Sequence, residues 1–181
     1  QLEQGESANL EKFVSEIISR NLRNSIFVDV TASDVVAAVY AQLLEKSVNV
    51  VACNKVAASS AYSNYKKLKD LARAYNCQFL FETNVGAALP IIATLNDLVS
   101  SGDTIHRMQA VLSGTLNFVF NNYDGSRNFA DVVKQAQEEG YTEPDPRLDL
   151  SGTDVMRKIM ILAREAGHKM EMDDISNNSF M

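Results

Sequence analysis

Acidic residues and a lysine gather towards the C-terminal end of the sequence, in a pattern that could support proton transfer. Glu143, Asp149 and Asp154 are the acids, and Lys158 follows Asp154 by four residues. On a helix, that spacing places Asp154 and Lys158 on one face. A surface ion pair there contributes about 0.2–0.5 kcal/mol, and spacing alone favours this structural interpretation. The functional interpretation is a lysine that exchanges a proton with a substrate.

Three shorter motifs each have a structural and a functional interpretation. Lys55 comes after a predicted strand and Asn54, where it could contact a phosphate or transfer a proton, although a solvated loop lysine is favoured on sequence alone. Residues 82–90 contain Gly86 and several alanines, which fit a tight packing turn or a turn whose carbonyls bind a hard cation. Residues 113–115 could bind an anion through backbone N–H groups, but a plain helix N-cap is favoured.

The hydrophobic pattern alternates between strands and helices, which predicts an α/β fold. Predicted strands cover residues 25–30, 48–52, 78–82 and 104–112. Predicted helices cover residues 9–21, 34–46, 60–75, 85–101, 114–122, 129–139 and 152–167, and residues 140–150 are predicted to form a loop. This order is half of a doubly wound parallel sheet with further helices. Ligands of such sheets bind beyond the carboxyl ends of the strands, here residues 31–33, 54–57 and 83–87.

Composition excludes several classes of protein. The 181 residues include 17 basic and 23 acidic side chains, and the net charge of −6 argues against a general nucleic-acid binder. No apolar run is long enough to predict a membrane span. Two cysteines do not make a disulfide framework, so we expect a reducing, cytoplasmic environment. The sequence contains no Gly-x-Gly, so a dinucleotide-binding protein of this kind would need its glycine loop before residue 1.

Five motifs, taken together and in this order, resemble homoserine dehydrogenase. The resemblance extends from about residue 12 to about residue 175, and the flanking sequence resembles the dehydrogenase half of a bifunctional aspartokinase/homoserine dehydrogenase. The motifs are Val-Asp-Val-Thr-Ala-Ser at 28–33, Asn-Lys-Val-Ala at 54–57, Asn-Val-Gly-Ala-Ala-Leu-Pro at 84–90, Leu-Ser-Gly-Thr-Leu-Asn at 112–117, and the long, specific Gly-Tyr-Thr-Glu-Pro-Asp-Pro-Arg-Leu-Asp-Leu-Ser-Gly-Thr-Asp at 140–154.

The resemblance implies a domain organisation and an activity. Residues 1–83 would be the C-terminal part of an NAD(P)-binding Rossmann domain, and residues 84–181 an incomplete α+β domain for substrate binding and dimerisation, so that the fold is truncated at both ends. The family interconverts L-homoserine and L-aspartate 4-semialdehyde with NAD or NADP, in the biosynthesis of threonine, methionine and isoleucine. The implied partners are a second copy, through a C-terminal region not in this sequence, and a fused aspartokinase domain, but no nucleic acid or membrane.

The resemblance also implies roles for individual residues. Lys158 would be the catalytic proton donor and acceptor, and Lys55 would act beside the nicotinamide and the reacting oxygen. The implied substrate ligands are Glu143, Asp149 and Asp154. The implied cofactor contacts are Thr31, Ser33, Lys55 and Gly140. The implied sodium site, made largely of backbone carbonyls, consists of Glu82, Val85, Ala87 and Leu89.

Two departures from the family pattern, and two alternatives, remain. Leu148 replaces the first of two usual acids, and Ala88 replaces a glycine beside the implied sodium site. A related sugar-type oxidoreductase usually has Glu-Lys-Pro where this sequence has Asn-Lys-Val at 54–56. The other alternative is a non-catalytic ligand-binding or assembly module. Because that alternative needs no proton transfer, the intact acids and Lys158 argue against it. We also expect Asp154 to point to substrate rather than form a dominant ion pair with Lys158.

Overall fold

The computed structural model describes residues 7–142 and 144–179. The chain divides into two compact units, Gln1–Asn84 and Val85–Met181, which we describe separately. Among the described residues, no helix is both long enough and apolar enough to cross a membrane.

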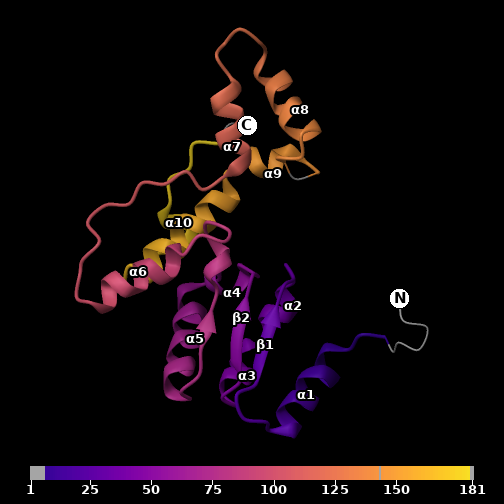
Figure 1. Ribbon diagram of the computed structural model, residues 1–181, viewed down its shortest axis with the longest axis vertical. Helices are drawn as coiled ribbons and strands as arrows, with labels where there is room; N and C mark the ends of the chain where they lie inside the picture. Colours follow the sequence, from indigo (N-terminus) through magenta and orange to yellow (C-terminus); the bar gives the residue numbers. More distant parts are fainter. Residues whose placement is uncertain (1–6, 143, 180–181) are drawn as a thin grey trace. The chain divides into compact units, whose positions relative to one another are not determined.

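The first unit is built on a parallel sheet whose strand order is β1-β2-β3 (Figure 1). The strands are β1 (Ile26–Asp29), β2 (Asn49–Ala52) and β3 (Phe79–Leu80). Its helices are α1 (Leu10–Arg20), α2 (Asp34–Ala37), α3 (Tyr40–Leu44), α4 (Val56–Ser59) and α5 (Tyr62–Ala74), followed by the 3-10 helix η1 (Glu82–Asn84). Parallel neighbours require crossover connections, and the helices between successive strands provide them. The predicted α/β class is confirmed here.

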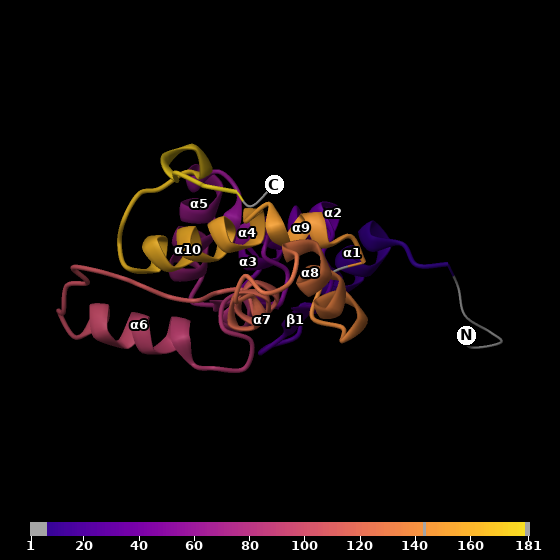
Figure 2. The same ribbon diagram turned by 90° about the horizontal axis from the view of Figure 1, so that it is seen from above.

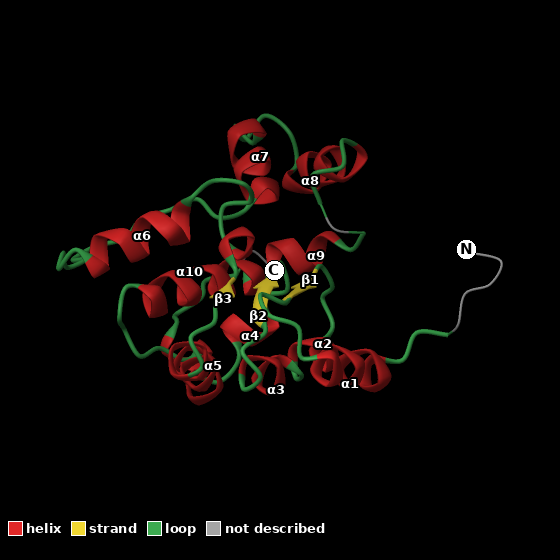
Figure 3. Ribbon diagram, turned by 60° about the horizontal axis from the view of Figure 1, so that its bottom comes forward, coloured by secondary structure: helices red, strands yellow, loops and turns green. Residues whose placement is uncertain are grey.

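The core of the first unit lies on one face of this sheet. Figure 3 shows α1, α3 and α5 on the same side of the strands. Phe27 and Phe79 point to that side and surround Tyr40 of α3, with ring centroids 6.3 and 5.8 Å from the tyrosine ring. Residues at alternate positions of a strand point to opposite faces, and Val28 and Leu80 are accordingly exposed.

Two predictions for the first unit need small corrections. The helix predicted over residues 34–46 is divided into α2 and α3, because Val39 N–H bonds to Val36 O, three residues back instead of four. The strand predicted over 78–82 is limited to β3, since the chain turns into η1 at Glu82.

Helices form all the regular structure in the described part of the second unit. They are α6 (Ile91–Ser100), α7 (Gly114–Asn122), α8 (Phe129–Glu138), α9 (Pro146–Leu150), α10 (Thr153–Glu165) and the 3-10 helix η2 (Met172–Asp174). Helices α7 and α8 pack together around Val119, Val132 and Ala136. Helix α6 lies along α10 (Figure 2), where Asn96 Nδ2 donates to Glu165 Oε2 at 2.9 Å.

Three predictions for the second unit are wrong. The helix expected from residue 85 begins only at Ile91, because Gly86 and Ala87 have φ values of +81° and +53° that a helix does not allow. The strand expected at 104–112 has no ladder partner among the described residues, and these residues have no regular secondary structure. The loop expected at 140–150 contains α9, whose start is capped by Asp145 with Pro146 in the first turn.

Candidate functional site

A buried carboxylate joins the loops that follow β1 and β2. Asp29, the last residue of β1, is 1% exposed. Its Oδ1 accepts a hydrogen bond from Thr31 N–H at 2.7 Å. Its Oδ2 accepts from Tyr40 Oη at 2.5 Å and from Asn54 Nδ2 at 3.0 Å. Because Asn54 Nδ2 also donates to Ser33 O at 2.9 Å, one carboxylate and one amide hold both loops.

These bonds fix the backbone around three predicted cofactor contacts. Thr31 Oγ1 accepts from Ser33 N–H at 3.1 Å. Asn54 Oδ1 accepts from Val56 N–H at 3.0 Å, in the turn that leads through Lys55 into α4. Thr31 is exposed, and Ser33 and Lys55 are half-buried. The structure therefore brings all three positions to the carboxyl ends of two neighbouring strands.

The charge on Asp29 is stabilised by its donors. Burial opposes ionisation, but the hydrogen bonds from Tyr40, Thr31 and Asn54 outweigh it and hold the pKa of the carboxyl below its usual value. Burial, together with the hydrogen bond to Asp29 and its negative charge, raises the pKa of Tyr40. The tyrosine hydroxyl is therefore a permanent donor at neutral pH.

Sequence reasoning did not single out Asp29 or Asn84. In β1, Asp29 has the same alternation phase as buried Phe27, and a carboxylate in the buried phase of a strand is the signal that could have identified it. Asn84 lies beyond β3, is fully buried, and donates from Nδ2 to Ala52 O at 3.0 Å. Its Oδ1 has no hydrogen-bond partner among the described residues. All three strands are thus followed or ended by a buried polar side chain.

Lys158 lies in the second unit, on α10, with 19% of its side chain exposed. Its Nζ donates to Leu112 O at 2.8 Å and lies 2.6 Å from Asp154 Oδ2. The expectation that this ion pair would not dominate is therefore wrong, whereas the expected orientation of Asp154 towards substrate stays a prediction. The reason is local, because a largely buried ammonium needs acceptors and Asp154 lies one helical turn away.

Lys158 lines a cavity of about 420 Å³, a size suited to a small molecule. The same cavity is lined by Ser113 and Gly114, at the start of α7. Ser113 caps this helix by accepting from Leu116 N–H at 3.1 Å. Because a helix N-terminus and an ammonium both favour negative charge, the cavity is suited to an anionic group or a developing oxyanion.

Asp149 is connected to the same helix start through Thr115, which is 3% exposed. Thr115 Oγ1 lies 2.8 Å from Asp149 Oδ1 and 2.6 Å from Tyr141 O, so its hydroxyl joins α7 to α9 and to the chain after α8. Gly140 ends α8 with a φ of +78° and is exposed. Glu143 lies outside the described residues.

The predicted sodium positions are divided between the two units. Glu82 belongs to η1 of the first unit, whereas Val85, Ala87 and Leu89 belong to the second. In the second unit, Leu89 N–H donates to Gly86 O at 3.0 Å, which curls the backbone into a tight turn. Among the described residues, no group of three or more histidine, cysteine, aspartate or glutamate side chains could hold a metal.

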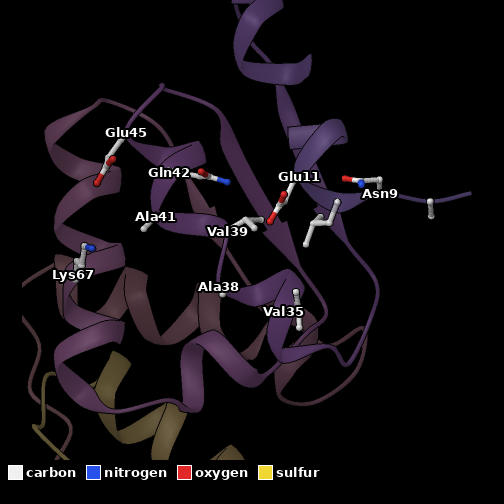
Figure 4. Close-up of a pocket in the computed structure, with 11 residues that line it drawn as sticks. Asn9, Glu11, Val35, Ala38, Val39, Ala41, Gln42, Glu45 and Lys67 are labelled. Carbon is white, nitrogen blue, oxygen red and sulfur yellow. The ribbon is translucent and has the colours of Figure 1, made fainter. Parts of the chain in front are cut away.

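A second hollow, of about 860 Å³, lies in the first unit between the start of α1 and the helices α2 and α3. Figure 4 shows Glu11, Gln42 and Glu45 among its polar side chains and Val35 and Val39 among its apolar ones. No predicted site residue lines this hollow. We therefore assign the candidate site to the Asp29 loops and the Lys158 cavity, each within its own unit.

Comparison with known proteins identifies relatives along nearly the whole chain. Residues 90–181 match the family model described as homoserine dehydrogenase, and residues 3–82 match the model described as its NAD binding domain. A chloroplastic bifunctional aspartokinase/homoserine dehydrogenase 1 of Zea mays is 47% identical over 98% of this chain. A bifunctional enzyme of Haemophilus influenzae is 41% identical over 93% of it. The chain spans only 20% and 21% of these two relatives.

Solved structures are also similar to this chain. A Candida auris protein of unknown function is 34% identical, with a TM-score of 0.90 over 97% of this chain and 51% of its own. A hyperthermophilic archaeal homoserine dehydrogenase in complex with NADPH is 28% identical, with a TM-score of 0.77 over 92% of this chain and 50% of its own. With both halves matched by the models of one family, the chain belongs to the homoserine dehydrogenase family.

Proposed function

We propose that this chain is part of an NAD(P)-dependent oxidoreductase that interconverts L-homoserine and L-aspartate 4-semialdehyde. Family membership supports this proposal. The single observation that carries it is Lys158, whose Nζ is held by Leu112 O and Asp154 at a cavity that also contains the start of α7.

The reaction needs a base at the substrate oxygen. Oxidation of a primary alcohol to an aldehyde removes a hydride from carbon and a proton from oxygen. NAD or NADP, when bound, accepts the hydride. Lys158 takes the proton, for which the amine must be neutral. Glu143 pairs with the substrate ammonium, and Asp154 binds at the hydroxyl end of the substrate, beside Lys158. Lys158 first releases one proton to solvent and then, as a neutral amine, accepts the proton of the hydroxyl.

The remaining site assignments are proposals of the same kind. Thr31, Ser33 and Lys55 hold the nicotinamide half of the cofactor, with Gly140 as a further contact. Thr31 fits this role because it is exposed at the carboxyl end of β1, where its hydroxyl accepts from Ser33 N–H. Glu143 and Asp149 complete the substrate site. The carbonyls of Glu82, Val85, Ala87 and Leu89 bind sodium.

Three further proposals concern the whole protein. It assembles as a homodimer or a higher oligomer, and it carries a fused aspartokinase domain, as the names of the bifunctional relatives indicate for those proteins. The cytoplasmic location expected from the cysteine content stays a prediction.

Lys158→Ala and Lys158→Arg test the proposed reaction in the enzyme that contains this chain. We expect Lys158→Ala to lower kcat about a hundredfold or more, which is the usual scale of acid–base catalysis. Lys158→Arg should not restore it, because arginine stays charged. Lys134→Ala is the matched control, since Lys134 forms an exposed i,i+4 pair with Glu138 on α8. If Lys158→Arg keeps most of the activity, Lys158 only binds. An unchanged rate in Lys158→Ala would refute Lys158 as the base, and a wild type without dehydrogenase activity would favour the non-catalytic module.

A further inference from the structure

Asp29 supports two functional loops at once. Its Oδ1 bonds to the backbone of the loop after β1, at Thr31. Its Oδ2 bonds to Asn54, whose amide oxygen in turn holds Val56 N–H at the turn that carries Lys55. A displacement of the carboxylate would therefore be transmitted to both loops.

The arrangement is chemically specific for a carboxylate. An ionised carboxylate only accepts hydrogen bonds, and Asp29 accepts from Thr31 N–H, Tyr40 Oη and Asn54 Nδ2, and also from the Thr31 side chain. An asparagine at this position would direct an NH₂ group at one of these donors. Such an unmatched pair in a buried position costs more than the loss of one hydrogen bond.

The Tyr40 hydroxyl, which donates to Asp29, is rigidly placed. Tyr40 has no exposed surface, and its ring packs between Phe27 and Phe79. Its hydroxyl is thus fixed by the core of the first unit, and Asp29 is fixed by that hydroxyl. The core, the carboxylate and the two loops form one continuous chain of contacts.

We propose that Asp29 is a positioning residue of the dehydrogenase, which sets the Thr31–Ser33 loop against the cofactor and the Asn54 turn that orients Lys55. This inference rests on the proposed function. The inference extends that function, because it assigns the mutual placement of the cofactor loop and Lys55 to a residue that touches neither substrate nor cofactor.

The test uses the enzyme that contains this chain. It compares asparagine-to-alanine changes at the two ends of β2, and it includes Asp29→Asn. Asn54 lies at the carboxyl end. Asn49 lies at the amino end, where its Nδ2 donates to Ser25 O at 3.0 Å and its Oδ1 accepts from Gln78 N–H at 2.9 Å. Asn49→Ala therefore removes the same kind of side chain from the same sheet, far from the loops.

We expect Asp29→Asn and Asn54→Ala to lower kcat and raise the cofactor KM, each by about tenfold or more, with a smaller change in the homoserine KM. Asn49→Ala should lower the melting temperature but leave all kinetic parameters within about twofold of wild type. If the role of Asp29 were purely structural, Asp29→Asn would lower the melting temperature and leave the kinetic parameters unchanged. The proposal is overturned if folded Asp29→Asn is within about twofold of wild type, or if Asn49→Ala loses as much activity.

Amide hydrogen exchange separates this proposal from the proposed function. Val56 N–H is bonded to Asn54 and does not touch Asp29, so its exchange reports the coupling without an assay of activity. We expect its exchange to be about tenfold faster in Asp29→Asn, with that of Gln78 N–H unchanged. An inactive wild type would refute the dehydrogenase and leave this coupling measurable. Unchanged Val56 exchange would refute the coupling.

Tyr40→Phe keeps the test decisive if Asp29→Asn does not fold. It preserves the packed ring and removes only one donor to Asp29. We expect faster Val56 exchange and a raised cofactor KM, each by about threefold, on the scale of one hydrogen bond. If this variant leaves both unchanged, Asp29 is not a positioning residue.

Discussion

At the residue scale, the sequence indicated the chemistry of Lys158 but only part of its environment. Its pairing with Asp154 could be predicted, because a spacing of four residues is a property of any helix. Its second acceptor, Leu112 O, is 46 residues away, and no local pattern encodes that contact. Asp29 was missed for a related reason, since its donor Tyr40 reaches it only when α3 packs on the sheet.

A prediction about pH follows from the carboxyl of Asp29. Its pKa in the folded state lies below the ordinary value of 3.8, despite burial, because of its hydrogen-bond donors. The ionised group therefore contributes stability that is fully present above the unfolded pKa and is lost as the pH falls through the folded pKa. We expect the free energy of unfolding of wild type to fall more steeply than that of Asp29→Asn between about pH 4 and pH 2. Urea unfolding across this range measures both, and parallel curves would contradict the assignment.

A second prediction at this scale concerns Thr115. Its hydroxyl joins Asp149 to the start of α7, and its side chain is buried. We expect Thr115→Val to lower the free energy of unfolding by about 1–3 kcal/mol, because it removes a buried hydroxyl that lies within hydrogen-bond distance of both Tyr141 O and Asp149 Oδ1. Thr115→Ser is the control, since it retains the hydroxyl. If urea unfolding shows that Thr115→Val loses no more stability than Thr115→Ser, the hydroxyl does not make the expected contribution.

At the element scale, a helix or strand was predicted correctly where the residues that determine it lie close together in the sequence. Helices α1, α5, α7, α8 and α10 match their predictions to within about two residues, because an amphipathic stripe and capping side chains are read over a single window. The predicted strand at 104–112 failed because a strand exists only with a partner, which its own residues cannot reveal. Helix α9 was missed although Asp145 and Pro146 form an ordinary N-terminal signal.

The turn before α6 gives a prediction at this scale. A Cβ at Gly86 would lie 2.2 Å from Ile91 Cδ1, and the φ of Gly86 is +81°. Gly102 has a φ of +90° with no atom within 4 Å of such a Cβ, so it is the matched control. We expect Gly102→Ala to cost about 1–2 kcal/mol from backbone strain alone. Gly86→Ala should cost about 1 kcal/mol more, because Ile91 must also move. Thermal unfolding of both variants measures the difference, and equal losses would show that Ile91 adapts freely.

At the scale of the whole molecule, the proposed site is divided between two units. The division lies at Asn84 and Val85, and the two family models match on either side of it. The first unit carries Thr31, Ser33, Lys55 and Glu82, and the second carries Val85, Ala87, Leu89, Gly140, Asp149, Asp154 and Lys158. Motifs in the sequence named these residues, but only the folded units reveal which of them share a hydrogen-bond network.

The affinity of the 181-residue chain for a dinucleotide gives the last prediction. Its sequence contains no Gly-x-Gly, and in this fold class such a loop and the helix after it bind the pyrophosphate. The loops held by Asp29 carry the proposed contacts Thr31 and Lys55 and lead into α2 and α4, but neither loop contains the Gly-x-Gly that lets a pyrophosphate approach a helix N-terminus. We therefore expect NADPH to bind this chain with a dissociation constant above about 100 μM, more than 2.7 kcal/mol weaker than binding at about 1 μM. Titration followed by NADPH fluorescence measures it, with the archaeal dehydrogenase solved in complex with NADPH as positive control. Low-micromolar binding that is lost in Thr31→Val would show that the Asp29 loops hold the cofactor without a glycine loop.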